Sequence, residues 1–183
     1  YKEFNQSLPQ GVKLLAVSKG HPASSIRWLV DLGHRDFGES RLQEALVKVN
    51  ELKDIRGLRW HFVGRLQANK VRGVVKAFSV IHSVDSFSLA ERISRIAGEE
   101  KKLPDVLLQV KFREDPAKGG MSPEDLLEKW PQFKQLSNLR IIGLMAMAPI
   151  DFDFADRKAL FSDCRSLANQ LALHDCSMGM ESG

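Results

Sequence analysis

The residue of this sequence best placed to do chemistry is a lysine that closely follows an apolar run. Residues Leu14–Val17 are apolar, and Lys19 comes two positions later. A lysine attacks a carbonyl carbon as its neutral amine, and partial burial favours that form over the charged one. The spacing predicts a Schiff-base lysine whose amine emerges from a packed wall of strands. The alternative is a lysine whose stem packs on a strand end while its charged head reaches water.

Other polar residues stand at the ends of later apolar runs. His61 and His82 have no partner at metal-ligand spacing, and a structural role is the simpler interpretation of both. Glu39 and Asp85 are acids in similar places, and capping of the next helix explains them as well as catalysis does. The segment 177–179, Ser-Met-Gly, is a candidate flexible turn whose N–H groups could hold a phosphate if a helix began soon after it.

The elements that must position these residues alternate along the chain. Short apolar runs predict strands at 12–18, 36–38, 59–63, 80–83, 105–110, 139–145 and 176–180. Amphipathic stretches predict helices at 22–32, 41–53, 67–77, 86–97, from 122, and at 154–173. The expected buried face of the helix 41–53 is Leu42, Ala45, Leu46, Val49 and Leu52. Apolar strands that are each followed by a helix favour a parallel sheet covered by helices.

Seven such units favour an α/β protein of the (β/α)8 TIM-barrel type, with the last βα unit missing from the sequence. The alternative is a doubly wound open sheet, but no glycine-rich turn follows the first strand to form a dinucleotide site. In a barrel the functional face is formed by the carboxyl ends of the strands. We therefore expect Lys19 and the other candidates to lie at that face.

Composition and charge restrict the class of protein. A chain of 183 residues, 43% hydrophobic and 27% charged, is typical of a soluble single domain, which we expect to span 1–183. No run approaches the roughly 18 apolar residues of a membrane helix, and no secretory leader is visible. The 27 lysines and arginines exceed the 23 acids but are dispersed, so we expect no nucleic-acid partner. Two cysteines and no apolar surface stripe predict a cytoplasmic monomer.

Several segments taken together are similar to one protein family. They are 17–19 (VSK), 35–44 (RDFGESRLQE), 60–70 (WHFVGRLQANK), 81–86 (IHSVDS), 108–110 (LQV), 143–145 (GLM) and 177–180 (SMGM). In this order they resemble the pyridoxal phosphate homeostasis proteins, over nearly the whole chain. The resemblance implies a barrel similar to the N-terminal domain of alanine racemase. It also implies pyridoxal 5′-phosphate (PLP) as the cofactor, held as an aldimine by Lys19.

The resemblance further implies which residues contact the cofactor. They are Lys19, Ser40, Ser83 and Met145 around the ring, and Ser177 with Gly179 at the start of the phosphate cradle. Two positions depart from the family pattern. The family often has asparagine where Ser40 stands, which changes one hydrogen bond to the cofactor. It usually has serine where Glu181 stands, and an acid there would repel a phosphate.

The function implied by the resemblance is to carry or buffer PLP and to regulate PLP and amino-acid and keto-acid homeostasis, without robust catalysis. A PLP-dependent amino-acid racemase is the main alternative. Racemisation needs a second acid–base group on the opposite face of the cofactor, and the single tyrosine is Tyr1. A cofactor-free aldolase that uses Lys19, and an interaction module with a basic surface, are further alternatives. The expected partners are PLP and either PLP-dependent client enzymes or a regulatory protein.

Overall fold

The computed structural model of the chain describes residues 1–113 and 119–180. Strands and helices alternate along it, as the sequence predicts. The elements are α1 (Lys2–Ser7), β1 (Ala16–Val17), α2 (Ala23–Asp31), β2 (Asp36–Glu39), α3 (Leu42–Glu51), β3 (Arg59–Phe62), the 3-10 turn η1 (Ala68–Lys70), α4 (Val71–Ala77), β4 (Val80–Val84), α5 (Phe87–Glu99), β5 (Asp105–Gln109), α6 (Pro123–Phe133), β6 (Arg140–Ala148), α7 (Phe154–Gln170) and β7 (Asp175–Met180).

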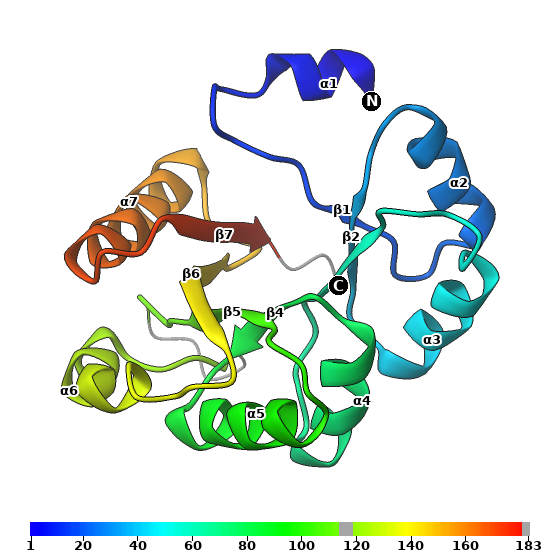
Figure 1. Cartoon of the computed structure of the whole chain (residues 1–183). Coiled ribbons are helices and arrows are strands. Elements are labelled where there is room, and N and C mark those ends of the chain that lie inside the picture. The colour runs from blue at the N-terminus through cyan, green and yellow to red at the C-terminus, as the bar shows by residue number, and fades with distance from the viewer. Residues whose placement is uncertain (114–118, 181–183) are drawn as a thin grey trace.

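The strands form one parallel sheet whose spatial order follows the chain from β1 to β7. The sheet curls around a central space, and helices α2 to α7 lie on its outer side (Figure 1). A doubly wound sheet reverses its strand order part-way, so the sequential order excludes that alternative. The predicted barrel architecture is confirmed. Within the described residues β1 and β7 are the two edges of the sheet, and the barrel is open between them.

The apolar core has two parts, one on each face of the curled sheet. The larger cluster joins the helices to the outer face and includes Ile26 of α2 and Ile93 of α5. A smaller, separate cluster is formed by Val80, Leu107 and Met145 from β4, β5 and β6. Successive side chains of a strand point to opposite faces, which is how one strand can serve both clusters.

Charged residues tie together the amino-terminal ends of three strands. Asp105, the first residue of β5, accepts hydrogen bonds from Arg59 Nη2 at 2.5 Å and from Arg140 Nε at 2.7 Å. Arg59 and Arg140 are the first residues of β3 and β6. The ion pairs therefore lie at the end of the barrel opposite to Lys19, and they leave the carboxyl ends of the strands for the site.

Most of the predicted helices begin within one residue of the expected start, but they do not all bury the predicted face. Ser86 Oγ and Ser122 Oγ cap α5 and α6 by accepting backbone N–H groups of the first turn. In α3, however, Leu46 is 39% exposed, whereas Lys48 is only 5% exposed. The prediction of a wholly apolar buried face is therefore wrong for this helix, because a lysine occupies part of it. Within the described part of the chain, no helix is long and apolar enough to cross a lipid bilayer.

The amino-terminal region differs most from the sequence prediction. Only Ala16–Val17 of the predicted strand 12–18 is a strand, and Val17 is 46% exposed. β1 is an edge of the sheet and pairs only with β2 among the described strands. It therefore has backbone hydrogen bonds on one side, which leaves it short and partly exposed. The short helix α1 was not predicted, and the helix predicted at 67–77 is divided into η1 and α4.

Candidate functional site

Lys19 lies in the turn that follows β1, at the predicted carboxyl end of the sheet. The prediction that its amine is partly buried is wrong, because Lys19 is exposed. The reason is that β1 is an edge strand, so no second neighbour among the described residues covers the turn on its open side. Lys19 makes no hydrogen bond or ion pair with any other described residue. Its amine is therefore available to a ligand.

The loop after β2, which carries Ser40, lies directly against the loop after β3. Ser40 is half-buried. A methyl group on Gly64 would lie only 2.1 Å from the carbonyl oxygen of Ser40. Glycine at position 64 therefore allows the two loops to meet and holds Ser40 beside the barrel mouth. Sequence analysis included Gly64 in the segment 60–70 but gave it no role, and its local signal is a glycine directly after a predicted strand.

Replacing Gly64 by alanine is expected to displace the Ser40 loop, because the added methyl group meets backbone atoms that cannot rotate away. We expect the free energy of unfolding to fall by about 1–3 kcal/mol. The measurement is urea denaturation. Gly73→Ala in α4 is the matched control, because its methyl group would meet the end of the flexible Leu42 side chain. Equal stability of both variants would contradict the close contact.

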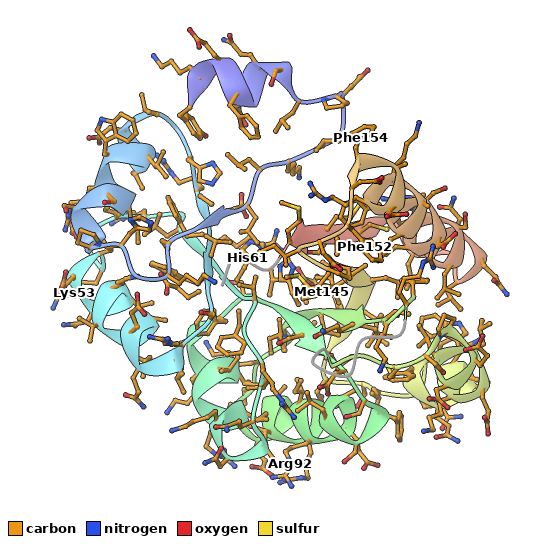
Figure 2. All side chains as sticks on the ribbon, turned by 180° about the vertical axis from the view of Figure 1, so that it is seen from behind. Lys53, His61, Arg92, Met145, Phe152 and Phe154 are labelled. Carbon is orange, nitrogen blue, oxygen red and sulfur yellow. The ribbon has the colours of Figure 1, made fainter. Side chains whose placement is uncertain are left out.

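A chain of hydrogen bonds connects four strands of the barrel. Asp36 Oδ1 in β2 lies 2.9 Å from His61 Nε2 in β3. His61 Nδ1 lies 2.8 Å from His82 Nε2 in β4. His82 Nδ1 lies 2.8 Å from Ser177 Oγ in β7. We call these four residues the histidine chain; Figure 2 shows His61 and Met145 near the centre of the ring of strands.

All hydrogen bonds in the histidine chain are donated in one direction, toward Asp36, because a carboxylate only accepts hydrogen bonds. His61 therefore donates Nε2–H to Asp36, His82 donates Nε2–H to His61, and the Ser177 hydroxyl donates to His82. Burial, and then the neighbouring His61 and Arg59, lower the pKa of His82 to about 3. Burial also lowers the pKa of His61, although the hydrogen bond to Asp36 opposes this shift. Both imidazoles are therefore neutral near pH 7.

The segment 177–179 belongs to strand β7, so the prediction of a flexible turn there is wrong. The Ser177 hydroxyl donates its hydrogen bond to His82, so its oxygen can only accept a hydrogen bond from a further partner. A methyl group on Gly179 would lie 3.4 Å from Met147 Sδ, which is an ordinary van der Waals contact, so packing does not require glycine at this position. The departure at Glu181 lies outside the described residues.

Ser83 and Met145 are both buried. Ser83 Oγ has no hydrogen-bond partner within the described residues. A buried hydroxyl without a partner is uncommon and marks a place where a ligand could supply the missing bond. Met145 packs against Val80 and Leu107 in the inner apolar cluster. Met145 therefore helps to fill the inside of the barrel.

A cleft of about 590 Å³ lies beside the barrel mouth. Its walls come from the loop after β3, including Arg65 and Gln67, and from α5 with its N-cap, including Ser86 and Arg92. Figure 2 shows Arg92 on the outer side of the molecule. None of the six residues predicted to contact the cofactor lines this cleft. The cleft is therefore separate from the site that the sequence predicts.

Comparison with known proteins identifies the family. The pattern of the family described as alanine racemase, N-terminal domain, matches residues 1–177. The pyridoxal phosphate homeostasis protein of Synechocystis sp. is 42% identical over 186 residues, which cover 98% of this chain and 85% of that protein. The chain belongs to the pyridoxal phosphate homeostasis protein family. The protein of the same name from Pseudomonas aeruginosa is 44% identical over 94% of this chain and 75% of its own length.

Solved structures agree with this family assignment. PipY of Synechococcus elongatus PCC7942 with PLP bound has a TM-score of 0.93 and 45% identity, over 99% of this chain and 87% of its own. PipY without PLP has a TM-score of 0.94 and 40% identity, over 98% and 94%. Alanine racemase of Clostridium difficile 630 has a TM-score of 0.72 at 14% identity, over 97% of this family member and 48% of the racemase, which shows a common fold alone.

Proposed function

We propose that this chain binds PLP covalently through Lys19 and carries or buffers it in vitamin B6 homeostasis. The observation that supports this function best is an exposed lysine at the carboxyl end of a barrel strand, without a hydrogen-bond or ion-pair partner among the described residues. The family assignment adds to it, because the related PipY has been solved with PLP bound. The proposed contacts are Lys19, Ser40, Ser83, Met145, Ser177 and Gly179.

The residues of the chain fit PLP in their chemistry. When bound, PLP supplies an aldehyde whose carbon can bond to a primary amine while its oxygen leaves as water. Lys19 offers an amine that no other described residue occupies. Ser83 offers a buried hydroxyl that makes no hydrogen bond to the described part of the chain. Because the Ser177 hydroxyl already donates its hydrogen bond to His82, we expect backbone N–H groups near Gly179 to hold the phosphate.

The hydrogen bonds and the burial of the candidate acid–base groups favour the carrier function over racemisation. Racemisation requires a second group that moves a proton on the other face of the cofactor. The hydroxyl of Tyr1 lies 2.8 Å from His34 Nδ1, and the Tyr1 ring packs edge-on against the His34 ring. Tyr1 therefore has a structural role between the amino terminus and β2. His61 and His82 are buried and bonded to each other, which removes them as freely moving acids.

The cellular setting is also part of the proposal. We infer a single cytoplasmic domain that works as a monomer and passes PLP to client enzymes or signals its loading to a regulatory protein. Sedimentation velocity at micromolar concentration is expected to give one species with the mass of a monomer. A stable dimer at that concentration would contradict the monomer.

The decisive experiment is an absorbance spectrum of the purified full-length protein with PLP, before and after borohydride reduction. We expect a visible band that borohydride removes, and a peptide map in which the reduced pyridoxyl group is on Lys19. A protein that stays colourless with PLP but reacts with a carbonyl substrate would favour a cofactor-free aldolase. A label on another lysine would overturn the assignment of Lys19.

Replacing Ser83 by alanine is expected to weaken PLP binding about fivefold, which corresponds to one hydrogen bond of about 1 kcal/mol. Stability without ligand should stay unchanged or rise, because the variant removes a buried hydroxyl that has no hydrogen-bond partner in residues 1–113 and 119–180. Fluorescence titration and thermal denaturation measure the two effects. Ser166→Ala on the exposed face of α7 serves as the control. An unaltered dissociation constant would show that Ser83 does not contact the cofactor.

A further inference from the structure

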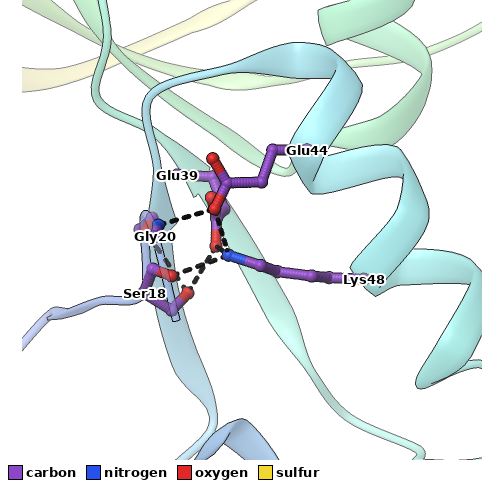
Figure 3. Close-up of polar contacts among 6 residues, drawn as sticks. Ser18, Gly20, Glu39, Glu44 and Lys48 are labelled. Carbon is purple, nitrogen blue, oxygen red and sulfur yellow. Dashed lines mark hydrogen bonds and ion pairs between the residues drawn. The ribbon is translucent and has the colours of Figure 1, made fainter. Parts of the chain in front are cut away.

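The turn that carries Lys19 is anchored on both sides of the lysine. Before it, the Ser18 N–H donates to the Gly38 carbonyl oxygen at 2.9 Å, and Ser18 Oγ donates to Glu39 Oε1 at 2.6 Å. After it, the Gly20 N–H donates to Glu44 Oε1 at 2.6 Å (Figure 3). Lys19 is exposed, but its backbone is therefore held at a fixed place relative to β2 and α3.

Lys48 of α3 connects these anchors. Its ammonium group donates to Glu39 Oε1, to Glu44 Oε1 and to the carbonyl oxygen of Ser18, each at 2.7 Å (Figure 3). An ammonium group has three protons, so these three acceptors use all of them. Lys48 thus holds the turn directly through Ser18 and indirectly through the two glutamates. We call Glu39, Glu44 and Lys48 the clamp.

Two members of the clamp are buried, and one of them, Lys48, lies where a helix face would ordinarily carry an apolar residue. Glu39 is fully buried and Lys48 is 5% exposed. Burial by itself would lower the pKa of Lys48, but the hydrogen bonds to Glu39 and Glu44 outweigh it and raise that pKa. The hydrogen bonds from Lys48 and from the Gly20 N–H lower the pKa of Glu44. Lys48 and Glu44 therefore keep their charges near pH 7.

Burying the charged groups of Glu39 and Lys48 costs free energy of desolvation, and a purely structural role does not explain that cost. Two charges taken out of water often stabilise a protein no better than apolar residues of the same size. Within the described residues, Glu39 Oε2 is in addition buried without a partner. The clamp instead fixes two points of the chain, Ser18 and Gly20, with Lys19 between them.

We propose that the clamp is a positioning device for Lys19, and that Lys48 is its central residue. This inference rests on the proposed covalent binding of PLP. Lys19 has a long, flexible and exposed side chain, so the reach of its amine is determined by where its backbone is held. Gly20 has a φ of +74°, a conformation that favours glycine, and this conformation sets the direction in which the chain continues toward α2. Fixing the backbone raises the effective concentration of the amine at the ligand.

The test compares Lys48→Met with Lys53→Met. Lys53 is exposed just beyond the end of α3, and Figure 2 shows it on the outer side. We expect Lys48→Met to raise the PLP concentration needed for half-maximal borohydride trapping at Lys19 about tenfold or more. Lys53→Met should leave it unchanged. Equal trapping by both variants would overturn the proposal.

A double-mutant cycle separates positioning from general structural damage. In a Lys19→Ala background PLP binds only non-covalently, and Lys48→Met should change its dissociation constant less than twofold. An equal loss of affinity with and without Lys19 would show a general structural effect and overturn the proposal. Absence of trapping in the unmutated protein would instead show that the proposed function itself fails.

A second pair of variants keeps the proposal testable if Lys48→Met does not fold. Glu44→Ala removes the anchor of the Gly20 N–H, whereas Glu44→Gln retains an acceptor for it. We expect weaker trapping at Lys19 for alanine and rescue by glutamine. In the protein without ligand, hydrogen exchange of the Gly20 amide should become at least tenfold faster in Glu44→Ala. Unchanged exchange and trapping in Glu44→Ala would contradict the clamp.

Discussion

Replacing Lys19 by alanine is expected to abolish borohydride-trapped PLP on the protein, while the fold remains as stable as before. The covalent bond needs a primary amine at this position, and alanine has none. The free energy of unfolding should change by less than about 0.5 kcal/mol, because Lys19 is exposed and contacts no other described side chain through a hydrogen bond or ion pair. Mass spectrometry of the reduced protein and urea denaturation measure the two effects.

Lys111→Ala is the control for this variant. Lys111 follows β5 and is also near the carboxyl ends of the strands, but it is not a proposed contact of the cofactor. Its removal should leave the trapped PLP unchanged. Full labelling of the Lys19→Ala protein, or equal loss in the two variants, would exclude Lys19 as the attachment site.

Acidification from pH 7 to pH 4 is expected to destabilise the unmutated protein more than a His82→Gln variant. In the unfolded chain His82 takes up a proton near pH 6.5, whereas burial lowers its pKa to about 3 in the folded protein. The unfolded state therefore binds more protons as the pH falls, and stability decreases with it. The contribution of neutral His82 is complete above pH 6.5 and is lost between pH 6.5 and pH 3. It amounts to about 3 kcal/mol between pH 7 and pH 4.

The measurement is urea denaturation at several pH values. Both proteins contain the same carboxylates, so the difference between their free energies of unfolding gives the contribution of His82. His174→Gln is the control, because His174 is exposed before β7. This control should keep the full pH dependence of the unmutated protein. An unchanged pH dependence in His82→Gln would contradict a neutral, buried His82 in the histidine chain.

The fold was largely predictable because its signals are local. Apolar runs and amphipathic stretches alternate, and each run formed a strand of the barrel in the predicted order. The capping serines Ser86 and Ser122 were predictable for the same reason, since a cap depends on the few residues that follow it. The short β1 was not, because the length of an edge strand depends on its neighbour in the sheet.

The candidate site was predictable as a set of residues but not as a set of contacts. The position of Lys19 at a strand end follows from the sequence pattern, whereas its exposure does not. The helix pattern assigned Leu46 to the buried face of α3 and overlooked Lys48. A lysine is buried there because Glu39, at the end of the adjacent β2, presents a carboxylate that needs a cation.

The sequence by itself determined the order of elements, the barrel, the family and the place of Lys19, because hydrophobic periodicity and motif spacing are properties of neighbouring residues. Only the tertiary structure decided that Asp36, His61, His82 and Ser177 form one chain of hydrogen bonds. It also decided that the clamp holds the Lys19 turn from β2 and α3. Curling of the sheet and docking of α3 bring these residues within 3 Å, and no local pattern encodes such distances.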